Sequence, residues 1–105
     1  MNSYRYRVTV ETLTNGKPTD GQALSFEAAN QEDILEIVER MRARLPFDED
    51  TIASLGVGLK LFSGVTLAQR HDPMFAMIGP ALKEFSRSLK ERSTAEAPAS
   101  LGRLL

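Results

Sequence analysis

The sequence predicts an α+β fold in which an N-terminal antiparallel β-hairpin is followed by three to four α-helices. Two patterns support this prediction: apolar residues alternate with polar ones over residues 4–11 and 24–28, and farther along they recur every three to four positions. A chain of 105 residues is typical of one domain and can bury a core. We therefore expect a single α+β domain over residues 1–92 and a flexible C-terminal tail over residues 93–105, which is small, polar and aperiodic.

The predicted hairpin begins with the strand YRYRVTVE at residues 4–11, whose tyrosines and valines share one face. A second alternating run carries Leu24, Phe26 and Ala28 on one face. Residues 15–21 between the two runs are rich in turn formers. Because Pro18 cannot donate a hydrogen bond to a strand ladder, we expect a loop longer than two residues.

The first predicted helix has Asn30 as its N-cap and residues 31–33 in its first turn, and it ends at Pro46. Its apolar positions recur with helical spacing and form the expected core stripe, which consists of Ile34, Ile37, Val38, Met41 and Leu45.

A second predicted helix follows the cap residue Asp48 and continues through Ile52, Leu59 and Phe62. The alternative is a strand over residues 57–61, because each internal glycine disfavours a helix by about 1 kcal/mol. We favour the helix and expect its small residues to form a ridge that lets another backbone approach closely; these are Ala53, Gly56, Ser63 and Gly64.

The C-terminal helical region begins at Asp72 and Pro73, a cap followed by a proline at the first helical position. We expect Gly79 and Pro80 to interrupt it, so that a further helix begins at Pro80. In that helix Leu82, Phe85 and Leu89 point inward, and the outer side is basic with Lys83, Arg87, Lys90 and Arg92.

Composition excludes several classes of function. There is no cysteine, which removes disulfides, thiolate nucleophiles and cysteine-ligated metals and fits the cytoplasm. The N-terminus has no apolar signal region and no stretch approaches the ~20 apolar residues of a membrane span, so we expect no membrane partner. A net charge of −1 gives no general attraction to nucleic acid.

A few residues could carry chemistry. His71 beside Asp72 could act as a base with its orienting carboxylate, but a C-terminal helix cation followed by a helix cap explains the pair equally simply and is our preferred interpretation. Residues 48–50 are all acidic, which suits a first helical turn better than a calcium loop. Arg5 and Arg7 beside Tyr6 could indicate a sheet that reads RNA, but the alternation places the arginines opposite the tyrosines and favours a solvated basic face.

Several segments together resemble a bacterial family of unknown function, domain-of-unknown-function family 3861. They are YRYRVTVE (4–11), LSFEAANQEDILEIVERMR (24–42), FDED (47–50) and GLKLFSGVTL with HDPMFAMIGPALKEF (58–85). The resemblance covers about residues 4–90. It implies a short bacterial protein with no assigned activity, it favours helix over residues 50–70, and it supplies no catalytic residue.

The sequence thus predicts a non-catalytic cytoplasmic protein-interaction or regulatory module without cofactor or metal. The alternative is a small ligand-binding domain or enzyme that uses His71. Residues 1–50 carry ten acidic and six basic residues, whereas residues 51–105 carry four and seven, so two copies can attract each other. Exposed strand edges also favour association with another chain, and we expect a homodimer or another protein as the partner.

Overall fold

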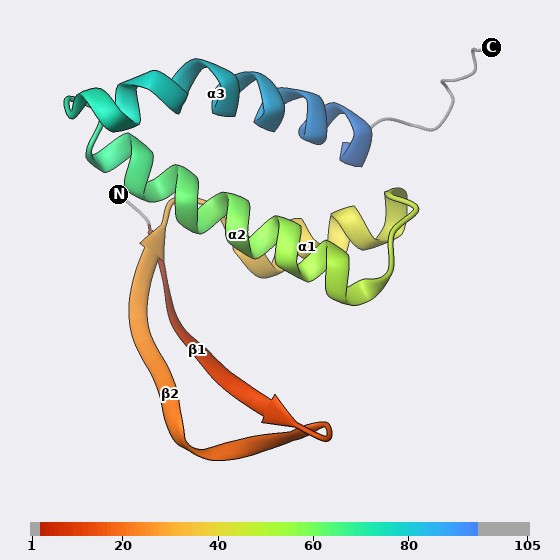
Figure 1. The fold of residues 1–105 in the computed structure, drawn as a ribbon. Helices are drawn as coiled ribbons and strands as arrows, with labels where there is room; N and C mark the ends of the chain where they lie inside the picture. The colour runs from red at the N-terminus through yellow and green to blue at the C-terminus, as the bar shows by residue number, and fades with distance from the viewer. Residues whose placement is uncertain (1–2, 95–105) are drawn as a thin grey trace. The chain divides into compact units, whose positions relative to one another are not determined.

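The fold consists of a β-hairpin and three α-helices, as the computed structural model of residues 3–94 shows (Figure 1). In chain order the elements are β1 (Tyr4–Thr14), β2 (Lys17–Asn30), α1 (Ile34–Arg44), α2 (Glu49–Ala68) and α3 (Pro73–Thr94). The predicted α+β class is confirmed, with three helices. Residue contacts divide the chain into two compact units, one that ends at Glu32 and one that begins at Asp33. The expected single domain over residues 1–92 stays a prediction, and residues 95–105 of the expected tail lie outside the described residues.

The first unit is a two-stranded antiparallel sheet. Its register opposes Tyr6 to Ala28, Val8 to Phe26 and Val10 to Leu24, so the two predicted apolar runs do share one face. The pairing is regular from Tyr4 to Glu11 and becomes irregular between Glu11 and Leu13. β2 bends visibly in this region (Figure 1), which is the usual effect of a bulge.

The hairpin turn has two residues, so the expected longer loop is wrong. Thr14 pairs with Lys17, and the intervening Asn15 and Gly16 have φ of 53° and 78°, as a type I′ turn requires. Pro18 is accommodated inside β2, opposite Leu13. In an antiparallel ladder, residue pairs that exchange hydrogen bonds alternate with pairs that do not. The pair Thr14–Lys17 closes the tight turn with hydrogen bonds, so the next pair, Leu13–Pro18, needs none. The missing N–H of proline therefore costs nothing there.

Helix α1 begins later than expected, and its N-cap is Asp33 rather than Asn30. The Asp33 carboxylate accepts a hydrogen bond from the Glu36 N–H, whereas the Asn30 side chain accepts one from the Glu32 N–H over a local turn. Asn30 still belongs to β2 and pairs with Tyr4. Strand pairing therefore holds the expected cap residue in β2, and residues 31–33 connect the strand to the helix instead of forming its first turn.

Helix α2 is continuous over 20 residues, which confirms the helical alternative over the strand. Asp48 is its N-cap, as predicted. Gly56 is buried, and a Cβ there would lie 2.9 Å from Val38 Cγ2 and 3.1 Å from Met41 Sδ. The glycine that disfavours the helix locally thus allows α1 side chains to pack directly on the α2 backbone.

Helix α3 continues through Pro80, so the predicted interruption and the possible fourth helix are wrong. Pro80 removes the N–H that would bond to the Ala76 carbonyl, one turn earlier. Its ring is tolerated on an exposed position of a helix that also packs on α1 and α2.

The core of the second unit lies mainly between α1 and α2. Its buried apolar side chains are Ile34, Val38, Met41, Leu45, Ile52 and Leu59. Each such side chain contributes roughly 1.5–3 kcal/mol when fully buried. The stripe predicted for α1 is therefore largely confirmed.

In length and composition α2 resembles a membrane-spanning helix, contrary to the expectation that no segment does. It has 20 residues and is apolar enough to cross a membrane, and only 22% of its most apolar 18-residue window is buried. Four leucines, together with Ile52, Val57, Phe62 and Val65, make α2 apolar. The same length and composition also occur in core helices, so these properties do not identify a membrane segment.

Candidate functional site

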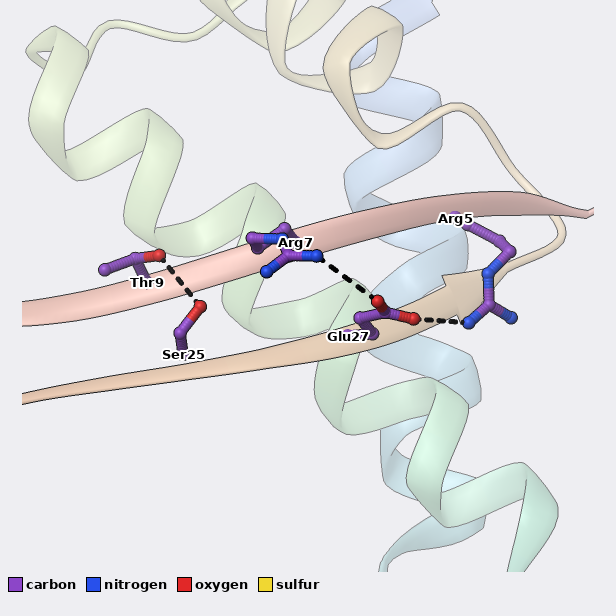
Figure 2. Close-up of polar contacts among 5 residues, drawn as sticks. All are labelled: Arg5, Arg7, Thr9, Ser25 and Glu27. Atoms are coloured by element: carbon purple, nitrogen blue, oxygen red, sulfur yellow. Dashed lines mark hydrogen bonds and ion pairs between the residues drawn. The ribbon is translucent and has the colours of Figure 1, made fainter.

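The polar face of the hairpin centres on Glu27, whose carboxylate joins two arginines of the neighbouring strand. Arg5 donates to Glu27 Oε1 at 2.6 Å, and Arg7 approaches Oε2 at 3.4 Å. Arg7 lies directly opposite Glu27, whereas Arg5 reaches it diagonally from the position opposite Ala29. Figure 2 shows the carboxylate between the two guanidinium groups. The arrangement fixes both arginines while leaving about 70% of each side chain exposed.

The row of polar side chains continues toward the turn. Thr9 Oγ1 and Ser25 Oγ lie 3.2 Å apart across the strands (Figure 2). Glu11 follows on the same face of β1 and makes no ion pair among residues 3–94. Along β1 the polar face is therefore positive at Arg5 and Arg7 and negative at Glu11. We call the side chains of Arg5, Arg7, Thr9, Glu11, Ser25 and Glu27 the polar row.

The opposite face of the hairpin presents apolar side chains to solvent. Val10 is 57% and Leu24 60% exposed, and Phe26 and Tyr4 are also exposed. Tyr6 is half-buried and donates its hydroxyl hydrogen bond to the Glu32 carbonyl at 3.3 Å. The solvated basic face favoured by the sequence is present, but its tyrosine face is only partly buried.

Both strands have free backbone edges, because the sheet within the described residues has only two strands. A free edge presents unpaired N–H and C=O groups that can bond to another strand. The hairpin therefore combines an exposed apolar face, a charged face and two strand edges.

His71 and Asp72 lie in the turn between α2 and α3 and do not form a convergent pair. The Asp72 carboxylate accepts a hydrogen bond from the Met74 N–H at 2.9 Å, so it caps α3 as the preferred interpretation proposed. The His71 side chain is exposed. Arg70 donates to the Leu67 carbonyl at 2.9 Å and so satisfies the C-terminal end of α2.

The acidic residues at the start of α2 also have local roles. The Thr51 hydroxyl donates to the Asp48 carboxylate at 2.5 Å, and the Thr51 N–H donates to it as well. These two hydrogen bonds lower the pKa of Asp48 below its ordinary value. Over residues 3–94, no three acidic or histidine side chains gather in a way that would hold a metal ion.

The basic side of α3 is partly neutralised within the helix itself. The Arg87 guanidinium bonds to Glu84 one turn earlier and to Glu91 one turn later, at 2.8 Å for the latter. The Glu84 hydrogen bond, supported by Glu91, raises the pKa of Arg87. An acidic docking partner is therefore not required to explain this face.

The helices also expose apolar side chains that the sequence pattern places inside. Phe62 and Phe85, expected in the core, are each 47% exposed, and Met77 is 76% exposed. Thr66 is buried, and its hydroxyl has no hydrogen-bond partner among residues 3–94. Helical spacing identifies an apolar stripe on each helix. It does not reveal whether the neighbouring helices are enough to bury every stripe, and here three helices leave part of the apolar surface exposed.

The structure brings together Arg5 and Arg7 but not His71 and Asp72. Sequence reasoning missed Glu27 as their common partner. The irregularity between Glu11 and Leu13 shifts the register by three residues, so that counting back from the turn would have placed Arg7 opposite Leu24 instead.

These features define a small α+β protein built from one β-hairpin and three helices. Residues 4–91 match the model of the Domain of Unknown Function family DUF3861, which has a solved structure, and the chain belongs to that family. It is similar to a crystal structure, solved at 2.20 Å, of a protein of unknown function from Pectobacterium atrosepticum, with 28% identity and a TM-score of 0.75. The similarity covers 86% of this chain and 99% of that one. The chain has no match among the curated proteins.

Proposed function

We propose that this protein is a non-catalytic protein-interaction or regulatory module of the bacterial cytoplasm, and that the β-hairpin is its binding element. The observation that carries the proposal is the hairpin itself: two strands with free edges and an exposed apolar face. A two-stranded hairpin is marginally stable in water and gains stability from additional strands or from packing.

The polar row supports the same proposal. Its ion pairs are exposed and contribute roughly 0.2–1 kcal/mol each, so they add little to folding. Charges arranged in this way influence the choice and orientation of a partner more than the stability of the chain. The hairpin can therefore bind through backbone edges while the polar row selects the partner, a mode known as β-augmentation.

The alternative function, an enzyme or ligand-binding domain that uses His71, has no observation in its favour. The imidazole is exposed and the neighbouring carboxylate is committed to capping α3. A general base needs a substrate position within hydrogen-bond reach and a partner that orients it.

The proposal is tested by comparing two variants that carry the same chemical change on different elements. Val10→Lys places a charge on the exposed apolar face of the hairpin, and Leu35→Lys places one on an α1 residue that is 68% exposed. Tagged full-length chains are used to capture proteins from a native bacterial lysate that also contains untagged copies of this chain. We expect wild type and Leu35→Lys to capture the same partner and Val10→Lys to lose it. Equal capture by Val10→Lys, or no partner for wild type, would refute the proposal.

A further inference from the structure

We infer that the partner at the hairpin is a second copy of this chain, bound antiparallel along the outer edge of β1 with the two Val8 residues opposite each other. This inference rests on the proposed function, because it uses the hairpin as the binding element. It adds the identity of the partner, the strand that binds and the register.

The register follows first from the two faces of β1. A symmetric antiparallel pair keeps its apolar faces on one side only if the two-fold axis passes through a residue pair. Over the regular part of β1 that axis can lie at Arg7, Val8 or Thr9. A pairing shifted by one residue would place tyrosines against arginines.

Charge and the regular length of β1 then select among the three positions. An axis at Arg7 opposes the two Arg7 side chains, and like charges directly opposite each other are destabilising. An axis at Thr9 also opposes Arg7 to Glu11 of the partner subunit twice. It places Arg5 opposite Leu13 of the partner subunit, however, beyond the irregularity in the strand, so its regular ladder is shorter than that of an axis at Val8. An axis at Val8 opposes Arg5 to Glu11 of the partner subunit twice, once on each side.

The groups needed for these two pairs are available. Glu11 makes no ion pair within the described chain. Arg5 shares the single carboxylate of Glu27 with Arg7 and remains 69% exposed. The same axis opposes Tyr6 to Val10 of the partner subunit, an aromatic and β-branched pair that is favourable across strands.

The outer edge of β2 provides fewer favourable side-chain pairs for a second copy than the outer edge of β1. Across β2 an axis at Glu27 opposes two carboxylates, and an axis at Phe26 opposes Ser25 to Glu27 of the partner subunit, with no opposite charges. Pairing through β1 produces a four-stranded sheet with a continuous apolar face, which satisfies the requirement of a marginal hairpin for further strands.

Charge reversal provides the first test. Arg5→Glu alone and Glu11→Arg alone each oppose like charges twice, whereas a mixture of the two variants restores both attractive pairs. We expect sedimentation velocity to show each single variant dimerising about ten- to a hundredfold more weakly than wild type and the mixture forming a dimer of near wild-type affinity. Because Arg5→Glu also breaks the contact with Glu27, far-UV circular dichroism checks the fold of each variant. Glu11→Arg disturbs no ion pair within the described chain and provides the independent arm.

Cross-linking provides the second test, and it reads the register directly. The chain has no cysteine, so a single introduced cysteine can form only an intermolecular disulfide. Opposed Cα atoms in an antiparallel pair lie about 4.5–5.5 Å apart, within the range of a disulfide. We expect Val8→Cys to cross-link with itself on mild oxidation, and Arg7→Cys and Thr9→Cys, which report the two rejected registers, to remain uncross-linked.

The outcomes separate this inference from the proposed function. A wild-type chain that stays monomeric at high micromolar concentration, or a dimer insensitive to both charge reversals, overturns the inference. Loss of a different captured protein in Val10→Lys would then still support the hairpin as a binding element. Self-cross-linking at Thr9→Cys or Arg7→Cys instead of Val8→Cys also overturns the inferred register.

Discussion

Gly56 tests whether α1 and α2 pack as closely as the structure shows. A methyl group added by Gly56→Ala would lie 2.9 Å from Val38 Cγ2 and 3.1 Å from Met41 Sδ, against an optimum of about 3.5–4.0 Å between carbon atoms. Met41 has a flexible side chain that can shift. Val38 is β-branched and stiff at χ1, so the backbone of α1 must move instead.

Two opposing effects set the size of the change. Overpacking a core by one methyl group costs about 1–3 kcal/mol, whereas replacing a helical glycine by alanine stabilises by about 1 kcal/mol. We therefore expect Gly56→Ala to destabilise the protein by about 1 kcal/mol, which corresponds to a melting temperature lower by roughly 4–8 °C.

Gly58 supplies the matched control in the same helix. A Cβ at Gly58 has no atom within 4 Å, so Gly58→Ala gains the helix propensity without the clash and should stabilise by about 1 kcal/mol. Urea unfolding followed by circular dichroism measures both variants. Equal stabilisation by the two alanines would show that α1 does not approach Gly56, and the packing described for α2 would be wrong.

A double-mutant cycle locates the clash. In the wild-type background Val38→Ala loses two buried carbons and costs about 2 kcal/mol. In the Gly56→Ala background the same change also removes the atom nearest to the new methyl group, so we expect it to cost at least about 1 kcal/mol less.

Three further predictions concern local structure. Asp48→Ala should destabilise α2. In wild type the stabilisation by this cap is present above the ordinary pKa of 3.8 and should be lost as pH falls through the lowered pKa of Asp48. Asp48→Asn keeps a cap oxygen but not the charge, so it should abolish this pH dependence in acid titrations followed by circular dichroism. Gly16→Ala should weaken the hairpin by roughly 1–2 kcal/mol because φ at Gly16 is +78°, and an unchanged urea midpoint would argue against the two-residue turn. Asp72→Ala should cost about 0.5–2 kcal/mol through loss of the α3 cap, whereas His71→Ala should change stability by less than about 0.5 kcal/mol; a larger effect of His71→Ala would contradict its exposed position.

The predictions for helix ends show where local pattern is sufficient. Asp48 and Asp72 were identified as caps because a cap acts on backbone groups two or three residues away. The cap at Asn30 failed for a different reason. Asn30, like Asp33, is a good cap by composition, but cross-strand pairing with Tyr4 holds Asn30 in β2, and that pairing involves a residue far away in the chain.

Pro80 misled in a similar way, whereas the helix predicted through Gly56 was confirmed. Pro80 lies inside α3 and Gly56 inside α2, although both residues disfavour a helix. Packing on neighbouring helices outweighs a local cost of a few kcal/mol, and at Gly56 it requires the small residue.

The sequence by itself determined the α+β class, the two faces of the hairpin, the core stripe of α1 and the caps of α2 and α3, because each depends on residues within a few positions of one another. The tertiary structure decided the strand register that joins Glu27 to Arg5 and Arg7, the continuity of α3, the close packing at Gly56 and the exposure of Phe62 and Phe85. These features depend on which distant segments meet and how much apolar surface they cover. Periodicity identifies an apolar face, but only packing in three dimensions determines whether that face is buried.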